Sequence, residues 1–304
     1  MKAVRFDERV AIVTGAGRGL GRAYALLLAS RGARVVVNDL GGTADGDGAS
    51  SEPATTVVQE ILERGGVAVA DTHTVTTADG AEAIVKTALG AFGRVDALIH
   101  NAGIVIGGAI ENMAAEKLDP VLDVHLRGAF FVIKAAWQVM QARCYGRVLN
   151  VISNAGLFGL PGFSAYAGAK GGLVGLTRSL ALEGARHNIK VNAVAPAAYT
   201  RLTADIPDAR IRRWFETRFQ PEWVAPIVAW LVHEDCAVTG EIYSAGAGRV
   251  ARVFIGETPG YTSQPLTLED VRDHFQQIRA ADGYVEPLSS LDEMSAYMRA
   301  IGYE

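Results

Sequence analysis

Short apolar runs alternate with longer amphipathic stretches over the first 200 residues of the chain. Several of the runs are rich in β-branched residues and stay apolar at consecutive positions, which is typical of strands buried on both faces of a sheet. The predicted strands are Val10–Thr14, Arg34–Asn38, Val67–Ala70, Ala97–His100, Arg147–Ile152 and Lys190–Ala195, with a seventh near Glu241–Ser244.

The stretches between these strands repeat their apolar residues with the period of a helix. The predicted helices are Gly19–Arg31, Pro53–Arg64, Asp79–Phe92, Leu118–Gln141, Tyr166–His187 and Glu222–His233. Strands that alternate with helices build parallel sheets covered by helices on both faces. We therefore predict an α/β fold with a doubly wound parallel sheet of about seven strands.

The sequence changes character beyond Gly248, where glycine or proline recurs at positions 256, 259, 260 and 265. Such punctuation is typical of a linker. Thr267 and Ser290 are each followed three residues later by an acidic residue, the signature of a capped helix start. We expect residues 1–250 to form the main domain and residues 251–304 to form a short helical extension packed on the core.

The composition is that of a folded protein and argues against a general nucleic-acid binder, although it leaves a local basic patch open. Among the 304 residues, 49% are hydrophobic and 20% are charged, which suffices to bury a core without disulfides or metal ions. The 29 basic and 33 acidic residues give a net charge of −4. A nucleic-acid binder would need a basic face to displace counterions from phosphates, so we expect no nucleic acid among the partners.

Location and assembly can also be anticipated. Cys144 and Cys236 stand outside any disulfide or metal-binding spacing, which predicts a reducing compartment and no metal site. The N-terminus is not that of a signal peptide, the last three residues do not match the peroxisomal Ser-Lys-Leu address, and no apolar run is long enough to span a membrane. We expect a cytoplasmic protein without membrane contact. The apolar surface of helices Leu118–Gln141 and Tyr166–His187 predicts a homodimer or homotetramer.

Glycines follow the first predicted strand at the spacing Gly15-x-x-x-Gly19-x-Gly21, with Arg18 and Leu20 inside the turn. Glycine lets the backbone approach a pyrophosphate closely, and the N–H groups at the start of the next helix attract the anion. The spacing differs from the general GxGxxG fingerprint, and glycines also end strands for steric reasons alone. The turn therefore gains weight only in company with other motifs.

Asp39 ends the second strand 18 residues after Gly21, about where an acidic side chain accepts hydrogen bonds from the ribose of a dinucleotide. Its carboxylate would repel the 2′-phosphate of NADP. Arg18 acts the other way, because a basic residue in the turn can meet that phosphate, but Leu40 offers no second basic contact. We predict NAD as the cofactor. A solvated Asp39 at the start of a loop is the plain alternative.

Small residues follow the fourth strand in Asn101-Ala102-Gly103. They would let a cofactor pass close to the strand end, and Asn101 can bridge backbone groups of neighbouring strands. Taken alone, the tripeptide would be better explained as a plain turn. His100, at the strand end, is expected to be structural.

A phenol and an ammonium group are four residues apart in Tyr166-Ala-Gly-Ala-Lys170, and so share one face of a helix. We expect the adjacent cation to lower the pKa of Tyr166 towards the range of a general base. Ser153 stands at the end of the fifth strand, where open α/β sheets present ligand-binding groups. These residues predict a site where a serine holds a substrate oxygen, a tyrosine exchanges its proton and a lysine tunes the tyrosine.

The ordered set of motifs resembles the short-chain dehydrogenase/reductase family, whose domain has a Rossmann fold. Its marks are Thr14-Gly-x-x-x-Gly-x-Gly21, Asn101-Ala-Gly103, a serine, Tyr-x-x-x-Lys and a proline loop after the sixth strand. Further segments are similar to the dehydrogenase region of the peroxisomal multifunctional enzyme branch, which oxidises (3R)-hydroxyacyl-CoA. The segments that carry this closer resemblance are Val36–Gly42, Val124–Gly128, Pro221–Pro226 and Gly246–Gly248. A stand-alone dehydrogenase is implied.

The resemblance implies a role for each matching residue. Tyr166 transfers the proton, Lys170 tunes it, Ser153 anchors the substrate, and His125 stands at the fourth catalytic position. The implied cofactor contacts are Gly15, Arg18, Gly19, Leu20, Gly21, Asp39, Thr74, Val75, Asn101, Ala102, Gly103, Tyr166, Lys170, Pro196, Ala198 and Thr200.

Three residues depart from the family pattern. His125 replaces the usual asparagine, as it does in the multifunctional-enzyme branch; it could hold a water that leads to Lys170 or leave proton relay to a backbone carbonyl. Ala197 stands where the proline loop commonly has glycine. His73 stands where an aspartate often meets the adenine amine.

The segment Ala197–Gln220 should cover the nicotinamide, because it follows the sixth strand. Ile211, Trp214, Phe215 and Phe219 fall on one helical stripe, with arginines at positions 210, 212, 213 and 218 around it. One interpretation is a lid that presents an apolar surface to an acyl or sterol body and arginines to CoA phosphates. The other is an amphipathic helix packed on the core.

Three hypotheses for function follow. The first is a dehydrogenase of (3R)-hydroxyacyl-CoA thioesters. The second is a dehydrogenase of hydroxysteroids or other secondary alcohols. The third, of another class, is a catalytically silent nucleotide-binding protein, and the intact set of Ser153, Tyr166 and Lys170 counts against it.

Overall fold

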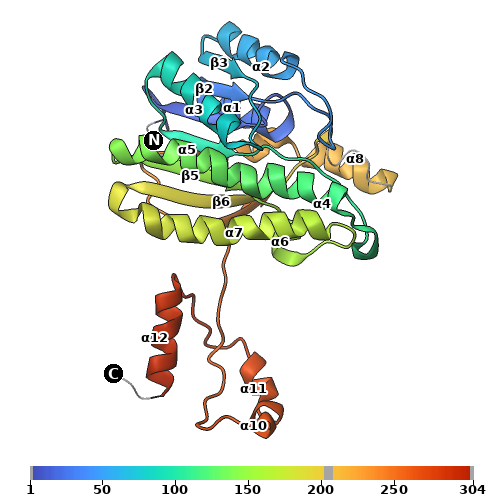
Figure 1. Ribbon diagram of the computed structural model, residues 1–304, viewed down its shortest axis with the longest axis vertical. Coiled ribbons are helices and arrows are strands. Elements are labelled where there is room, and N and C mark those ends of the chain that lie inside the picture. The colour runs from blue at the N-terminus through green and yellow to red at the C-terminus, as the bar shows by residue number, and fades with distance from the viewer. Residues whose placement is uncertain (1–2, 202–207, 302–304) are drawn as a thin grey trace. The chain divides into compact units, whose positions relative to one another are not determined.

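The computed structural model describes residues 3–201 and 208–301 of the chain. Its described part contains a sheet of eight strands in the order β3-β2-β1-β4-β5-β6-β7-β8 (Figure 1). The pairings from β3 to β7 are parallel throughout. The strands are β1 (Val10–Thr14), β2 (Arg34–Asn38), β3 (Val67–Asp71), β4 (Ala97–His100), β5 (Gly146–Val151), β6 (Ile189–Ala197), β7 (Ile242–Gly246) and β8 (Arg249–Val253).

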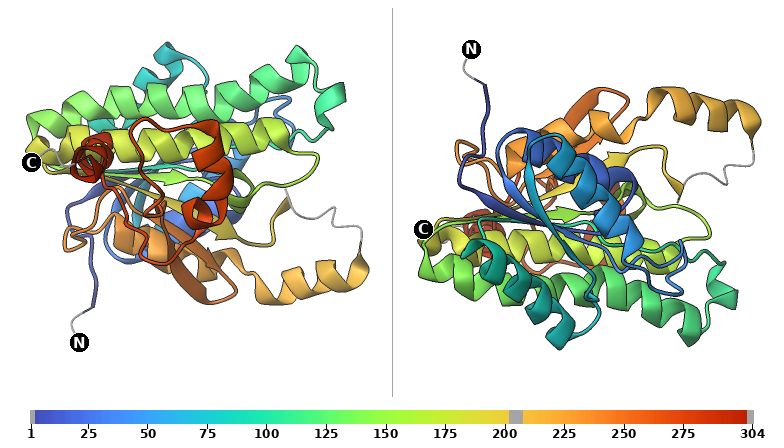
Figure 2. Two further views of the ribbon diagram at one scale, coloured as in Figure 1. Left: turned by 90° about the horizontal axis from the view of Figure 1, so that it is seen from below. Right: turned by 90° about the horizontal axis from the view of Figure 1, so that it is seen from above.

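Helices cover both faces of this sheet (Figure 2). In the main unit they are α1 (Gly19–Ser30), α2 (Glu52–Glu63), α3 (Ala78–Phe92), α4 (Ala115–Leu122), α5 (Gly128–Ala142), α6 (Asn154–Phe158), α7 (Ser164–Gly184), α8 (Ala209–Arg218) and α9 (Ala225–Leu231). One face packs apolar side chains of α1, α2 and α9 onto the strands. Helices α3, α5 and α7 lie on the other face. The predicted doubly wound α/β fold is confirmed.

The predicted helix Leu118–Gln141 is interrupted. Helix α4 contains Pro120, which has no N–H to donate, and a π-helical turn, Asp123–Arg127, separates α4 from α5. A π turn carries one extra residue, which changes the direction of the side chains that follow. His125, inside this turn, is buried with 1% exposure.

The edge strand β8 was not predicted from the sequence. Ala247 and Gly248 have φ angles of 50° and 78° and form the two-residue connection from β7. Positive φ angles at both positions are typical of a tight hairpin, so β8 returns antiparallel to β7. The sequence of β8, Arg-Val-Ala-Arg-Val, is mostly exposed, and so lacks the continuous apolar run by which the buried strands were recognised.

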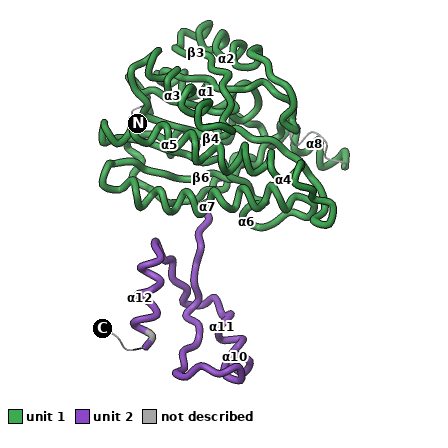
Figure 3. Tube along the Cα trace, viewed as in Figure 1, with its two compact units in different colours: residues 1–252 green, residues 253–304 purple. Residues whose placement is uncertain are grey.

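The chain divides into two compact units, residues 1–252 and 253–304 (Figure 3). The second unit holds α10 (Leu268–Asp273), α11 (Phe275–Arg279) and α12 (Ser290–Ala300). The helix start at Thr267 is confirmed, since its side chain and Asp270 form a reciprocal cap. The cap of α12 is Ser289 with Asp292, one residue before the predicted Ser290. That this extension packs on the core stays a prediction.

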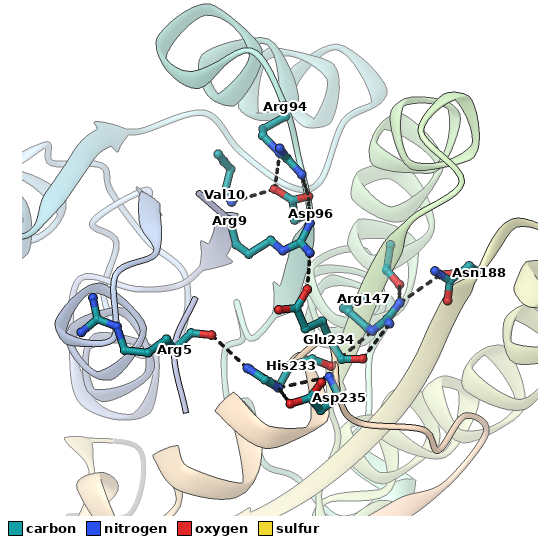
Figure 4. A network of polar contacts seen from close by, with 11 residues as sticks. Arg5, Arg9, Val10, Arg94, Asp96, Arg147, Asn188, His233, Glu234 and Asp235 are labelled. Atoms are coloured by element: carbon teal, nitrogen blue, oxygen red, sulfur yellow. Dashed lines mark hydrogen bonds and ion pairs between the residues drawn. The ribbon is translucent and has the colours of Figure 1, made fainter. Parts of the chain in front are cut away.

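A network of charged side chains lies where the central strands begin (Figure 4). The buried carboxylate of Asp96 accepts hydrogen bonds from the Val10 N–H at 2.8 Å and from Arg94 at 2.7 and 2.6 Å. The buried Arg147 donates to the carbonyls of Gly146 and Asn188 at 2.8 and 3.0 Å. This network joins the amino ends of β1, β4, β5 and β6.

Candidate functional site

The predicted catalytic residues converge at the carboxyl ends of the strands. Ser153 follows β5, while Tyr166 and Lys170 lie one turn apart on α7. The Lys170 Nζ is 5.7 Å from the centroid of the Tyr166 ring. The His125 ring meets the same tyrosine edge-on, with 5.2 Å between centroids. The strand order reverses between β1 and β4, the place where open α/β sheets bind ligands.

Ser153 is held in place by its role as the N-cap of α6. Its Oγ accepts a hydrogen bond from the Ala155 N–H at 3.2 Å. Gly156 lets α6 approach α7 closely, because a Cβ at this position would lie 2.8 Å from the Cβ of Lys170. The serine hydroxyl and the lysine therefore depend on the same close helix contact.

Lys170 is a buried amine with 3% exposure. Its Nζ donates a 2.6 Å hydrogen bond to the carbonyl of Val151, at the end of β5. Burial disfavours the charged ammonium and lowers the pKa of Lys170 to about 7. The amine can therefore gain or lose its proton near neutral pH.

The expectation that Lys170 lowers the pKa of Tyr166 is wrong for this arrangement. Burial raises the pKa of Tyr166 above its ordinary value, and only the hydrogen bond with Ser153 acts in the opposite direction. The physical reason is that removal of the phenolate from water outweighs the favourable contacts. The four-residue spacing correctly predicts that Tyr166 and Lys170 are neighbours. It does not predict how deeply the two side chains are buried.

His125 and His100 are both buried and neutral near physiological pH. The Nε2 of His125 is 2.7 Å from the Ile104 carbonyl, and its backbone carbonyl is 3.2 Å from the Nε2 of His100. Burial lowers the pKa of His100 to about 3 and that of His125 well below its usual range. The Nδ1 atoms of both rings have no hydrogen-bond partner among the described residues.

The glycine turn forms a cradle at the start of α1. This helix begins without a capping side chain or an acidic residue in its first turn, so its N–H groups and positive end suit an anion. A Cβ on Gly15 would lie 2.8 Å from the Ala102 Cα, and one on Gly21 would lie 2.2 Å from the Gly15 carbonyl oxygen. These glycines are needed for close packing, and the open helix start fits a pyrophosphate.

Asp39 closes one side of the cradle. Its two carboxylate oxygens accept hydrogen bonds from the N–H groups of Gly17 at 2.8 Å and Gly41 at 2.7 Å. Arg18 and Arg201 both donate to the carbonyl of Gly42, at 3.3 and 2.9 Å. Arg201 is a second basic residue at this corner; it could not be recognised from its sequence position, because it comes from the loop after β6.

Asn101 bridges the ends of two strands, as predicted. Its Nδ2 donates to the carbonyls of Thr14 and Gly15, both at 3.0 Å. The Thr14 Oγ1 accepts in return from the N–H groups of Asn101 and Ala102, also at 3.0 Å. Thr14 is therefore a positioning residue of the cradle that the sequence analysis named only as part of a motif.

The remaining predicted cofactor contacts surround the cradle. Thr200 lies over the glycine turn, since a Cβ on Gly19 would be 3.3 Å from its Cγ2. Gly103 lies against His125, with 2.5 Å between a Cβ placed there and the Cε1 of the ring. Leu20, the second residue of α1, is partly buried against the core. The other members occupy the ends of β3 and β6: Thr74, Val75, Pro196 and Ala198.

The His73 side chain, in the loop that follows β3, hydrogen-bonds to the last residue of that strand. Its Nδ1 lies 2.9 Å from the Asp71 carboxylate, which also accepts from Asn38 at 2.7 Å. The side chain is half exposed. The structure thus gives His73 a role in closing the β3 loop.

Part of the predicted lid forms a helix. Helix α8 begins at Ala209 behind a cap by Asp208, and none of its side chains is buried. The rings of Trp214, Phe215 and Phe219 pack against one another at its end. Residues 202–207 of the predicted segment lie outside the described residues. The exposed helix does not match the interpretation of an amphipathic helix packed on the core.

Two classes of site are not found in the part of the chain that the structure describes. None of its helices is both long and apolar enough to cross a membrane. No group of three or more histidine, cysteine, aspartate or glutamate side chains there is placed to hold a metal ion.

Comparison with known proteins gives a consistent match. A family model for short chain dehydrogenases matches residues 9–210. A short-chain type dehydrogenase/reductase of Mycobacterium tuberculosis is 47% identical over 91% of this chain and 96% of its own length. The peroxisomal multifunctional enzyme type 2 of Mus musculus is 44% identical over 90% of this chain, but over only 37% of its own length.

Among solved structures, the full-length peroxisomal multifunctional enzyme type 2 from Drosophila melanogaster superposes with a TM-score of 0.80. The sequence identity is 32%, and the match covers 98% of this chain and 50% of that chain. The chain therefore spans half or less of these multifunctional relatives. The matched sequence and fold agree with the motifs that converge on the carboxyl edge.

Proposed function

The chain belongs to the short-chain dehydrogenase family, and from that premise we propose that it oxidises the hydroxyl of a (3R)-hydroxyacyl-CoA with NAD. The family's members are oxidoreductases that act on CH–OH groups with a nicotinamide dinucleotide. The observation that carries the proposal is that Ser153, Tyr166 and Lys170 meet, and that His125 and the Asn101–Gly103 segment connect Tyr166 to the glycine turn.

Each of these residues has a defined task in the proposed reaction. The nicotinamide, when bound, supplies the hydride acceptor. Ser153 holds the substrate oxygen, and the Tyr166 hydroxyl takes part in proton transfer with that oxygen. Lys170 holds its amine 5.7 Å from the centroid of the Tyr166 ring, where it can donate a hydrogen bond to the ribose of the bound cofactor. His125, which stays neutral, positions the Tyr166 ring and the segment at Ile104 by its hydrogen bond.

The proposed choice of NAD rests on Asp39. Its carboxylate lies between Gly17 and Gly41 at the ribose corner of the cradle, where it would repel a 2′-phosphate. Arg18 and Arg201 lie at the same corner, but both guanidinium groups already donate hydrogen bonds to the Gly42 carbonyl. The measurement is kcat/KM with NAD and with NADP. Asp39→Ala should lower the ratio of kcat/KM with NAD to kcat/KM with NADP. An unchanged ratio would contradict the role of Asp39 in cofactor choice.

The substrate is tested with a panel. Purified protein, NAD and either (3R)-hydroxyacyl-CoA thioesters of several chain lengths or hydroxysteroids are mixed, and NADH absorbance is followed. We expect turnover with the thioesters. Turnover with the steroids alone would support the second hypothesis, for which the aromatic group at the end of α8 offers an apolar surface. No turnover with any alcohol, with NAD still bound, would support a silent nucleotide-binding protein.

We also propose that the protein is a cytoplasmic homodimer or homotetramer. A groove of about 1170 Å³ is lined by side chains of α3, α5 and α7, and Phe130 at this face is 53% exposed. Exposed apolar surface of this kind is typical of protein contacts. Light scattering should give a mass of two or four chains, and Phe130→Glu should reduce it.

A further inference from the structure

A second pocket lies outside the catalytic site, between α8, α9 and the hairpin of β7 and β8. Its volume is about 700 Å³, and its walls include Trp214, Arg218, Glu222, Trp223 and the turn at residues 247–248. This size is within the range of pockets that take small ligands. Among the described residues, no hydrogen bond, ion pair or ring contact joins these side chains to Ser153, Tyr166 or Lys170.

The pocket shares the sheet edge of the catalytic residues. Ala197 of β6 pairs with Gly246 of β7, which directly precedes the turn that lines the pocket. Val194 of β6 pairs in turn with Val151 of β5, two residues before Ser153. Figure 1 shows α8 at the same end of the sheet as α4. A long substrate can therefore reach both places along one edge.

Two indole rings are exposed at this pocket. Trp214 is 53% exposed and Trp223 is 45% exposed, although tryptophan is usually well buried. The edge contacts of Trp214 with Phe215 and Phe219, at centroid distances of 5.6 and 4.8 Å, brace its ring. The backbone N–H of Tyr199 also ties Phe219 to the loop after β6, at 2.7 Å. A braced, exposed indole is a suitable surface for stacking a flat base.

The same pocket is lined by one basic and one acidic side chain that do not form an ion pair with each other. Arg218 and Glu222 are four residues apart, yet the side chain of neither makes an ion pair or hydrogen bond with another described residue. A free guanidinium fits a phosphate, and a free carboxylate fits an amino group on an aromatic base. The combination of stacking surface, cation and acceptor is complementary to a phosphorylated adenosine.

We infer that this pocket binds the adenosine 3′-phosphate end of the CoA carrier, with the base on Trp214 and Trp223, the phosphate at Arg218 and the adenine amine at Glu222. This inference rests on the proposed oxidation of a CoA thioester. It also gives a basis for substrate choice, since a thioester on a carrier protein has no adenosine to place there. Of the four arginines around the aromatic stripe of α8, the structure assigns this task to Arg218.

Steady-state kinetics with two forms of one substrate test the pocket. The same (3R)-hydroxyacyl group is offered as its CoA thioester and as its N-acetylcysteamine thioester, which lacks the nucleotide. We expect Trp214→Ala and Arg218→Gln each to raise KM for the CoA thioester about tenfold, which is about 1.4 kcal/mol, because each removes one contact with the nucleotide. The kcat and the KM for the short thioester should stay within about twofold of the unmodified protein.

Two arginine variants serve as controls. Arg186→Gln changes an exposed arginine just before β6, at the amino ends of the strands. It should leave the KM for the CoA thioester and the KM for the N-acetylcysteamine thioester unchanged. Arg213→Gln changes another arginine of α8 that does not line the pocket. A larger effect of Arg213→Gln than of Arg218→Gln would overturn the assignment, as would equal effects on the two thioesters.

Direct binding separates failure of the pocket from failure of the proposed function. Adenosine 3′,5′-bisphosphate is titrated by calorimetry into protein saturated with NADH, so that the dinucleotide cradle is filled. Binding that both pocket variants lose and Arg186→Gln keeps supports the inference, even if no CoA thioester is oxidised. Absence of binding to the unmodified protein overturns the pocket, even if hydroxyacyl-CoA is turned over.

Discussion

The two edges of the sheet use buried polar side chains in opposite ways. At the amino edge, the Asp96 carboxylate is met by a backbone N–H and the Arg94 guanidinium, and an ion pair with Arg9 at 3.5 Å adds to them. At the carboxyl edge, Lys170 has one acceptor, Val151, and the Nδ1 atoms of His100 and His125 have no partner among the residues described.

We interpret the amino edge as the part that stabilises the fold and the carboxyl edge as the part that binds ligands. A buried polar group with all its partners fixes the fold, whereas one without a partner costs free energy unless a ligand satisfies it. The amino edge therefore holds the ends of four strands together, and the carboxyl edge keeps hydrogen-bonding capacity for cofactor and substrate. Substitutions at the two edges should separate accordingly into effects on unfolding and effects on turnover.

At the carboxyl edge, a large effect on turnover is expected for Lys170→Met. It removes the buried amine beside Tyr166 and should lower kcat/KM by about 10²–10⁴-fold, the range of acid–base contributions. The fold should survive, because methionine fills a similar volume without a buried charge. NADH absorbance measures the loss, and circular dichroism checks the fold. A variant with more than half of the original activity would contradict the role of Lys170.

The same variant tests the pKa of Lys170 through stability. Its pKa is about 7 in the folded protein and about 10.4 in an unfolded chain. Between these values the unfolded chain binds more protons, so stability rises with pH. Relative to Lys170→Met, the free energy of unfolding should rise by up to ~1.4 kcal/mol per pH unit from about pH 7 to about pH 10 and stay level below pH 7. A difference that does not vary with pH would show that the amine has its ordinary pKa.

The next effect belongs to the amino edge. Asp96→Asn leaves Arg94 without its carboxylate partner and should lower the free energy of unfolding by about 2–4 kcal/mol. Urea unfolding measures this change. The kcat per folded molecule should stay within about twofold, because the catalytic residues lie at the other edge. Loss of kcat without loss of stability would reverse the comparison between the edges.

A smaller effect is expected for His125→Asn. Burial keeps the pKa of His125 well below its usual range. The ring is therefore neutral and is not expected to act as a proton donor. Asparagine can still hydrogen-bond with Ile104, and kcat should fall by less than about tenfold. The pH profile of kcat/KM should keep its shape. Disappearance of a limb of that profile would show instead that His125 titrates during turnover.

Local patterns predicted most of the sheet and the central site. The bounds of β1, β2 and β4 agree with the predicted strands, because buried parallel strands are continuous apolar runs. Tyr166 and Lys170 share a helix face because their spacing is one helical turn. These features depend on neighbours in the sequence, and so can be recognised in it.

Features set by distant contacts could not be predicted in the same way. Arg201 reaches the Gly42 carbonyl across 159 residues of sequence. The pKa of Tyr166 is governed by burial, which depends on the packing of several elements. The π turn at His125 differs from an α-helix by one residue, a change that the apolar period of the long segment does not reveal.

The central claim is that the Tyr166 hydroxyl exchanges the substrate proton. The most direct test is a single-turnover measurement of NADH formation by Tyr166→Phe, with the affinity for NADH measured in parallel. The account predicts a rate lower by about 10²–10⁴-fold, with NADH affinity and thermal stability nearly unchanged. An unchanged rate of hydride transfer in this variant would contradict it.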